Sequence, residues 1–122
     1  MPHKHNWESQ KFLAREEALM TCILDMGEML LTSGAEVKRV EDTITRLCSV
    51  YAFVRVDVFT ITSSIVLTVR TPGGRILTQT RRILTRDTDL GRVEQVNALS
   101  RKLCAEPMSL CDFQREVELI RR

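Results

Sequence analysis

The stretch SGAEVKRVEDT, residues 33–43, contains the clearest helix end and helix start in the chain. Gly34 is able to adopt the left-handed backbone conformation that closes a helix. It follows a long segment with apolar residues at helical spacing, and a second such segment begins directly after it. We therefore expect two helices joined by a short turn, which makes them antiparallel neighbours.

The first of these helices is expected over about residues 9–33 and the second over about residues 35–51. Gly27 lies inside the first helix, where glycine costs roughly 1 kcal/mol relative to alanine. We interpret it as a position where another helix approaches closely. Each helix has one apolar face, formed in the first by Leu19, Cys22, Ile23, Met26 and Leu30, and in the second by Val37, Val40, Ile44, Leu47, Cys48 and Tyr51.

Three strands are predicted next, over residues 53–61, 64–70 and 75–84, because this region is rich in β-branched residues that alternate with polar ones. Thr62-Ser63 and Pro72-Gly73-Gly74 are the expected turns. Turns this short connect antiparallel strands. The region is therefore predicted to be a three-stranded meander with one face against the helices.

Two further helices complete the pattern, over about residues 90–104 and from the cap Ser109 to the end of the chain. Asp87, Thr88 or Asp89 is available to cap the first of them, and Pro107 follows its end. The fold class is thus α+β with the order αα-βββ-αα. We expect residues 9–122 to form one domain and residues 1–8 a flexible tail.

The composition excludes several functional classes. The net charge of +2 and the 5% of aromatic residues give no support to nucleic-acid binding. The longest apolar helical stretch, residues 18–31, is interrupted by Asp25 and Glu28 and is shorter than the ~20 residues that a membrane span needs. The two histidines, His3 and His5, lie in the tail, so no metal or cofactor is expected. The four cysteines lack metal-ligand spacing and read as reduced thiols of a cytosolic protein: Cys22, Cys48, Cys104 and Cys111.

The densest group of charges in the chain is at the start of the second helix. Glu36, Arg39, Thr43 and Arg46 form a stripe beside the apolar face, and Glu41 falls near the other edge of that face. This cluster reads either as a site for a charged small molecule or partner, or as a helix start stabilised by an ion pair between Glu36 and Arg39.

Two other polar features have alternative readings. A run of arginines between residues 70 and 92 is either a patch for phosphate, lipid headgroups or RNA, or a solvated face of the sheet. Strand alternation places the arginines of the strands on opposite faces. Asp57, in an otherwise apolar strand, is either a ligand contact or an acid at the edge of the sheet.

The succession of SGAEVKRVEDT, VRVDVFTITSSIVLTVR, a Gly-Gly hairpin and RRILTRDTDLGRVEQVNALSRKL resembles the N-terminal cytosolic domain of the threonine/serine exporter family of bacterial membrane proteins. The resemblance covers about residues 19–104. It implies a domain on the cytoplasmic side of the inner membrane, in a protein that exports small amino acids or related carboxylates. Because these residues contain no spanning segment, the resemblance also implies a transmembrane exporter domain or a separate membrane subunit as partner. We also expect the protein to form a homo-oligomer.

The resemblance further implies which motif positions are candidate binding residues, and we expect them to line a polar cleft between the second helix and the sheet. Arg39 would pair with a substrate carboxylate or with an acid of the family motif, and Glu36 or Glu41 would meet an ammonium group or a proton. The domain would act in gating, substrate capture or assembly. A hydrolase and a plain oligomerisation module are the alternatives, although no nucleophile–base motif is present. The full set of predicted binding residues is Glu36, Arg39, Glu41, Asp42, Asp57 and Asn97.

Overall fold

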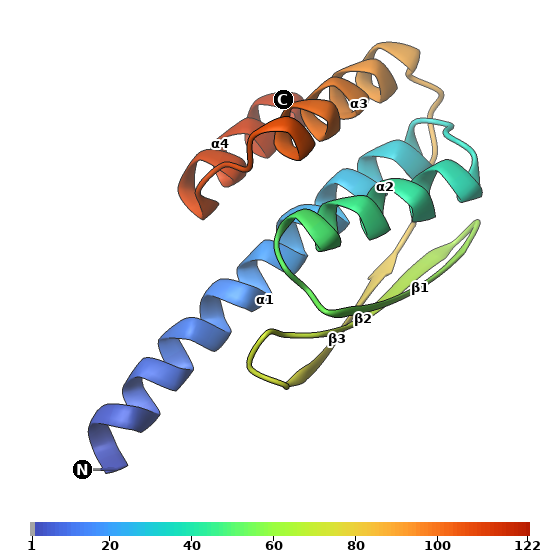
Figure 1. Ribbon diagram of the computed structural model, residues 1–122. Coiled ribbons are helices and arrows are strands. Elements are labelled where there is room, and N and C mark those ends of the chain that lie inside the picture. Colours follow the sequence, from blue (N-terminus) through green and yellow to red (C-terminus); the bar gives the residue numbers. More distant parts are fainter. Residues whose placement is uncertain (1) are drawn as a thin grey trace.

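The computed structural model describes the backbone of residues 2–122 and the side chains of residues 14–122. Its elements follow one another as two helices, three strands and two helices, which confirms the predicted α+β order. Figure 1 shows three layers: the sheet lies on one side of the first two helices, and the last two helices lie on the other. The elements are α1 (Pro2–Thr32), α2 (Val37–Val50), β1 (Arg55–Ile61), β2 (Ser64–Arg70), β3 (Ile76–Arg82), α3 (Leu90–Ala105) and α4 (Leu110–Arg121).

Helix α1 begins at Pro2 rather than near residue 9, so the helix includes most of the segment predicted as a tail. Met1, and the side chains of His3 and His5, lie outside the described residues. The helix ends as predicted at Gly34, whose φ is 105°. The Gly34 N–H donates to the Leu31 carbonyl at 3.3 Å and the Ala35 N–H to the Leu30 carbonyl at 2.9 Å. These two bonds are the Schellman arrangement, which satisfies the last carbonyls of α1 and turns the chain into α2.

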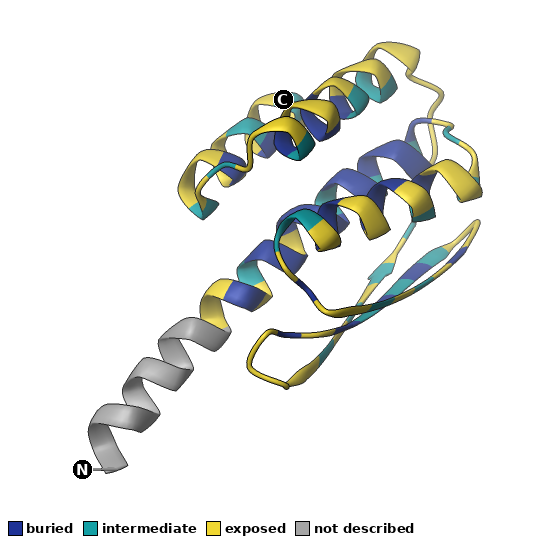
Figure 2. Cartoon of the chain, in the orientation of Figure 1, coloured by how far each residue is buried: buried dark blue, intermediate teal, exposed yellow. Residues whose placement is uncertain are grey.

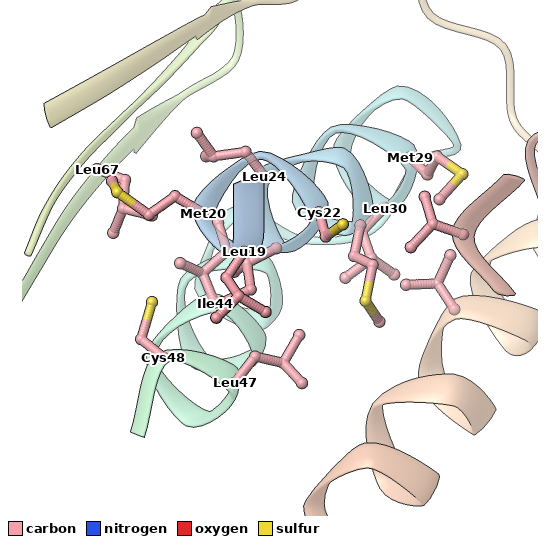
Figure 3. Packing of buried hydrophobic residues seen from close by; sticks show 14 of the residues in the cluster. Leu19, Met20, Cys22, Leu24, Met29, Leu30, Ile44, Leu47, Cys48 and Leu67 are labelled. Atoms are coloured by element: carbon pink, nitrogen blue, oxygen red, sulfur yellow. The ribbon is translucent and has the colours of Figure 1, made fainter. Parts of the chain in front are cut away.

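Helix α1 is buried on several sides because it lies in the middle layer. Figure 3 shows its side chains leaving in different directions, with Met20 toward Leu67 of β2 and Leu19 toward Leu47 of α2. The single apolar face predicted from the sequence is therefore only part of its buried surface. The additional buried residues of this helix with large apolar side chains are Met20, Leu24, Met29 and Leu31.

The close approach predicted at Gly27 is present between α1 and α2. A Cβ atom at this position would lie 2.7 Å from Cδ1 of Ile44, a residue with no exposed surface. Contact distances this short are repulsive, so the glycine sets how near the two helices lie.

The sheet has the order β1-β2-β3 with both pairs antiparallel. Its inner face packs against both helices, with β1 on α2 and with β2 and β3 on α1. The central strand contributes the buried residues Ile65, Leu67 and Val69. Among the described elements no helix covers the outer face, and Figure 2 shows the sheet mostly in the colours of exposed and intermediate residues. The meander and its single covered face are as predicted.

Helices α3 and α4 begin at side-chain caps. Asp89 Oδ1 accepts from the Arg92 N–H at 3.0 Å, and Ser109 Oγ accepts from the Asp112 N–H at 3.3 Å. Asp89 is thus the capping residue among the three candidates. The Asp89 N–H also donates to the Ser33 carbonyl at 3.0 Å, which attaches the start of α3 to the turn between α1 and α2. These contacts place α3 beside the start of α2, where the charged cluster lies.

Candidate ligand-binding site between α2 and α3

A cavity of about 380 Å³ opens between α2 and α3. Its volume is in the range of small-molecule sites, which is roughly 300–1,000 Å³. Except for Lys38 and Asp42, the α2 side of the cavity is the stripe of Glu36, Arg39, Thr43 and Arg46 expected from the sequence. The lining residues are Glu36, Lys38, Arg39, Asp42, Thr43, Arg46, Asn97, Ser100 and Arg101.

Helix geometry explains why these side chains face one another. Glu36 is the N-cap of α2 with extended backbone angles, and Arg39, Thr43 and Arg46 follow at spacings of three or four residues along one side of the helix. Asn97, Ser100 and Arg101 have the same spacing on α3. Two polar stripes from neighbouring helices therefore form opposite walls of the cavity.

The charges around the cavity are mixed, with an excess of positive charge. Four bases and two acids line it, so its formal charge is 4 − 2 = +2. Arg101 pairs with Glu94 at 3.5 Å, but the other charged lining residues form no ion pair within the described part of the chain. The predicted pair between Glu36 and Arg39 is thus absent, and both side chains are exposed to the cavity.

Two hydroxyl groups lie at the inner surface of the cavity. Thr43 is 5% exposed and Ser100 is 4% exposed, and one comes from each wall. Neither hydroxyl makes a hydrogen bond to any side chain or backbone group that the structure describes. The hydroxyl oxygens themselves are not enclosed, because the one fully buried side-chain oxygen or nitrogen without a partner among the described residues is Thr60 Oγ1. The two hydroxyls of the cavity wall are therefore accessible and available to bond a molecule in the cavity.

Two of the predicted site residues lie elsewhere. Glu41 is on the side of α2 that faces the sheet, and its Oε2 accepts from the Thr60 N–H of edge strand β1 at 2.8 Å. Asp57 lies on the outer face of the sheet, next to a separate depression. The structure therefore brings together Glu36, Arg39, Asp42 and Asn97, and the cavity is between α2 and α3 rather than between α2 and the sheet.

A second charged cluster was missed by the sequence analysis. Arg81 of β3 donates to Asp25 Oδ1 at 2.7 Å and to Glu28 Oε1 at 2.9 Å, both on α1, and Arg121 of α4 lies 3.1 Å from Asp25. Burial by itself lowers the pKa of the Arg81 guanidinium. The hydrogen bonds and charges of Glu28 and Asp25 raise that pKa by more than burial lowers it, so the pKa is above its ordinary value. Two features of the sequence could have indicated this cluster. Asp25 and Glu28 are three residues apart on one helix, and strand alternation places Arg81 on the face of β3 that meets the helices.

The buried cysteines are poor nucleophiles. Burial raises the pKa of Cys22 to about 11, with a further contribution from Asp25, and burial alone raises the pKa of Cys48 to about 12. Both thiols are consequently protonated at neutral pH, whereas nucleophilic attack needs the thiolate. Within the described side chains, no three His, Cys, Asp or Glu residues gather as metal ligands do.

The fold and the cavity define a small α+β domain with a charged, ligand-sized site between two helices. The chain belongs to the threonine/serine exporter (ThrE) family, whose sequence model matches residues 21–122. The matched region contains the turn at Gly34, the sheet and every residue of the α2–α3 cavity. No curated protein and no solved structure was found to match the chain. Among the described residues, none of the helices combines the length and apolar character needed to cross a membrane.

Proposed function

We propose that this chain is the cytosolic domain of an exporter of small amino acids, or related small carboxylates, and that it captures the solute in the α2–α3 cavity. The observation that carries the proposal is the cavity itself. Charged groups of both signs and two hydroxyls that no group of the described chain engages surround a volume suited to a small molecule. Membership of the threonine/serine exporter family supplies the class of solute.

The chemistry of a hydroxy amino acid suggests roles for the lining groups. The planar guanidinium of Arg39 suits a carboxylate, because it donates two parallel hydrogen bonds. Glu36 or Asp42 would meet the ammonium group. The hydroxyls of Thr43 and Ser100 would bond the polar groups that enter deepest, since these two are the least exposed residues of the lining.

The domain would work with a transmembrane exporter domain or a separate membrane subunit, on the cytoplasmic side of the bacterial inner membrane. A site on this side would collect the solute before it is transported. Binding that draws α2 and α3 together would also provide a signal for gating, because α3 is attached to the end of α1 through the Asp89–Ser33 hydrogen bond.

Calorimetric titration of the 122-residue chain with threonine, serine and a small dicarboxylate tests the proposal. We expect Arg39→Ala to weaken binding by about 10- to 100-fold, the effect of losing roughly 1.5–3 kcal/mol of charge-assisted hydrogen bonding. Glu41→Gln is the matched control, because Glu41 belongs to the same helix but faces the sheet. Unchanged affinity in Arg39→Ala, or equal losses in both variants, would overturn the assignment of this cavity.

A further inference from the structure

The outer face of the sheet combines exposed apolar residues with arginines. Strand alternation and the register bring one set of side chains onto this face, and none of the described helices covers it (Figure 1). Phe59 is 63% exposed, Ile76 is 64% exposed and Ile61 is 46% exposed. Large apolar side chains gathered on one exposed face usually mark a contact surface.

Three arginines lie on the same face. Arg55 of β1 is directly opposite Arg70 of β2. Arg82 lies at the other end of the sheet, in the same cross-strand row as Ile61. Like charges in directly opposed positions of a sheet are destabilising. The one acid that the three strands contribute here is Asp57, so the net charge of the strand residues on this face is 3 − 1 = +2.

None of these four charged side chains forms an ion pair within the described chain. A depression of about 270 Å³ lies beside the opposed arginines and is lined by Arg55, Asp57, Thr68, Val69, Arg70 and Ile76. An anion placed here would relieve the repulsion between Arg55 and Arg70, while Phe59 and Ile61 would remain free to enter an apolar phase.

We propose that the outer face of the sheet docks on the surface of a membrane that contains anionic lipids. Arginines attract the phosphate groups of the lipids, and the apolar residues enter the boundary between headgroups and acyl chains. A second copy of the chain fits this face less well, because two surfaces of charge +2 would repel each other. The proposal is independent of the α2–α3 cavity, which lies on the opposite side of α2 from the sheet, and it orients the domain on the membrane that an exporter occupies.

Cosedimentation of the chain with vesicles tests this proposal. We expect binding to vesicles of phosphatidylglycerol and phosphatidylcholine, little binding to phosphatidylcholine alone, and weakening as the salt concentration rises. Each of Arg55→Gln, Arg70→Gln and Arg82→Gln should weaken binding about fivefold, the effect of one basic residue near an anionic surface. Phe59→Ser should weaken it about tenfold without changing the charge.

The matched control removes the same charge from another surface. Lys102→Gln, Arg115→Gln and Arg122→Gln together take away three exposed positive charges from α3 and the end of α4, as many as the triple variant of Arg55, Arg70 and Arg82 takes from the sheet. This control should leave vesicle binding within about twofold of the wild type. Equal losses in the control and in the arginine variants of the sheet would show attraction by net charge alone, which overturns the proposal. The proposal is also overturned if the chain does not bind anionic vesicles, or if Phe59→Ser abolishes self-association and leaves lipid binding unchanged.

Discussion

Two charged regions of this domain differ in whether their charges are paired. Around Arg81, two acids of α1 accept hydrogen bonds from a single guanidinium of β3, and Arg121 of α4 lies close to one of them. Around Arg39, six charged side chains surround a cavity and one of them, Arg101, has an ionic partner among the described residues. The first arrangement joins three layers of the fold, whereas the second leaves its charges available for a molecule from outside. The comparison indicates that pairing, rather than charge density, separates a structural cluster from a binding site.

The largest effect on stability is expected from Arg81→Met. Asp25 is 16% exposed, and it would lose its shortest hydrogen bond while Glu28 lost its ionic partner. We expect the free energy of unfolding to fall by about 2 kcal/mol, because partly buried carboxylates would be left without full compensation. For a small protein this loss moves the urea midpoint by about 1 M.

Arg121→Ala is the control for that measurement. The Arg121 side chain is 48% exposed, and Asp25 keeps its bond to Arg81 when it is removed. Its loss should cost about 0.5 kcal/mol, as for other exposed ion pairs. Equal and small effects of both substitutions would contradict the structural role of the Arg81 cluster.

A smaller effect is expected at the contact between α1 and α2. In Gly27→Ala the new Cβ would lie 2.7 Å from Ile44 Cδ1 and 3.1 Å from its Cγ1. Crowding should cost about 2 kcal/mol, and the higher helix propensity of alanine should recover roughly 1 kcal/mol. We therefore expect the free energy of unfolding, measured in urea, to fall by about 1 kcal/mol.

Ile44→Val tests the cause of that loss, since valine lacks the Cδ1 atom that the new methyl group would meet. The substitution alone should cost about 1 kcal/mol. In its presence we expect Gly27→Ala to cost less than it does in the wild type, because only the 3.1 Å contact with Cγ1 remains. Additive losses in the double variant would show that the glycine has another role.

The sequence predicted those parts of the fold that depend on local chemistry. Gly34, Asp89 and Ser109 end or begin helices through their own backbone freedom or side-chain caps, and the β2 segment 64–70 has its predicted bounds. Alternation and hairpin signals were sufficient for the meander, because both depend on neighbouring residues. The start of α1 was misplaced: Ser9 is a residue type that often begins a helix, but the helix starts earlier, at Pro2, and continues through Ser9.

Long-range packing explains what the sequence did not show. The stripe of Glu36, Arg39, Thr43 and Arg46 followed from helical spacing, but which element lies opposite depends on how α3 returns across α2. Ser100 could not be distinguished from any other helical serine without that packing. The cluster around Arg81 likewise needs α1, β3 and α4 together, which no local pattern reports.

The smallest effect on stability is expected from residues that line the α2–α3 cavity. Arg39→Ala removes an exposed side chain without an ionic partner from a cavity of net positive charge, and Ser100→Ala removes a hydroxyl without a hydrogen-bond partner. Each should change the free energy of unfolding by less than about 0.5 kcal/mol, because no interaction of the folded chain is lost. Urea unfolding of both variants and of Arg81→Met measures the three free energies of unfolding under the same conditions. A loss of about 2 kcal/mol in Arg39→Ala would mean that this arginine stabilises the fold, and the distinction between the paired cluster and the open cavity would then be wrong.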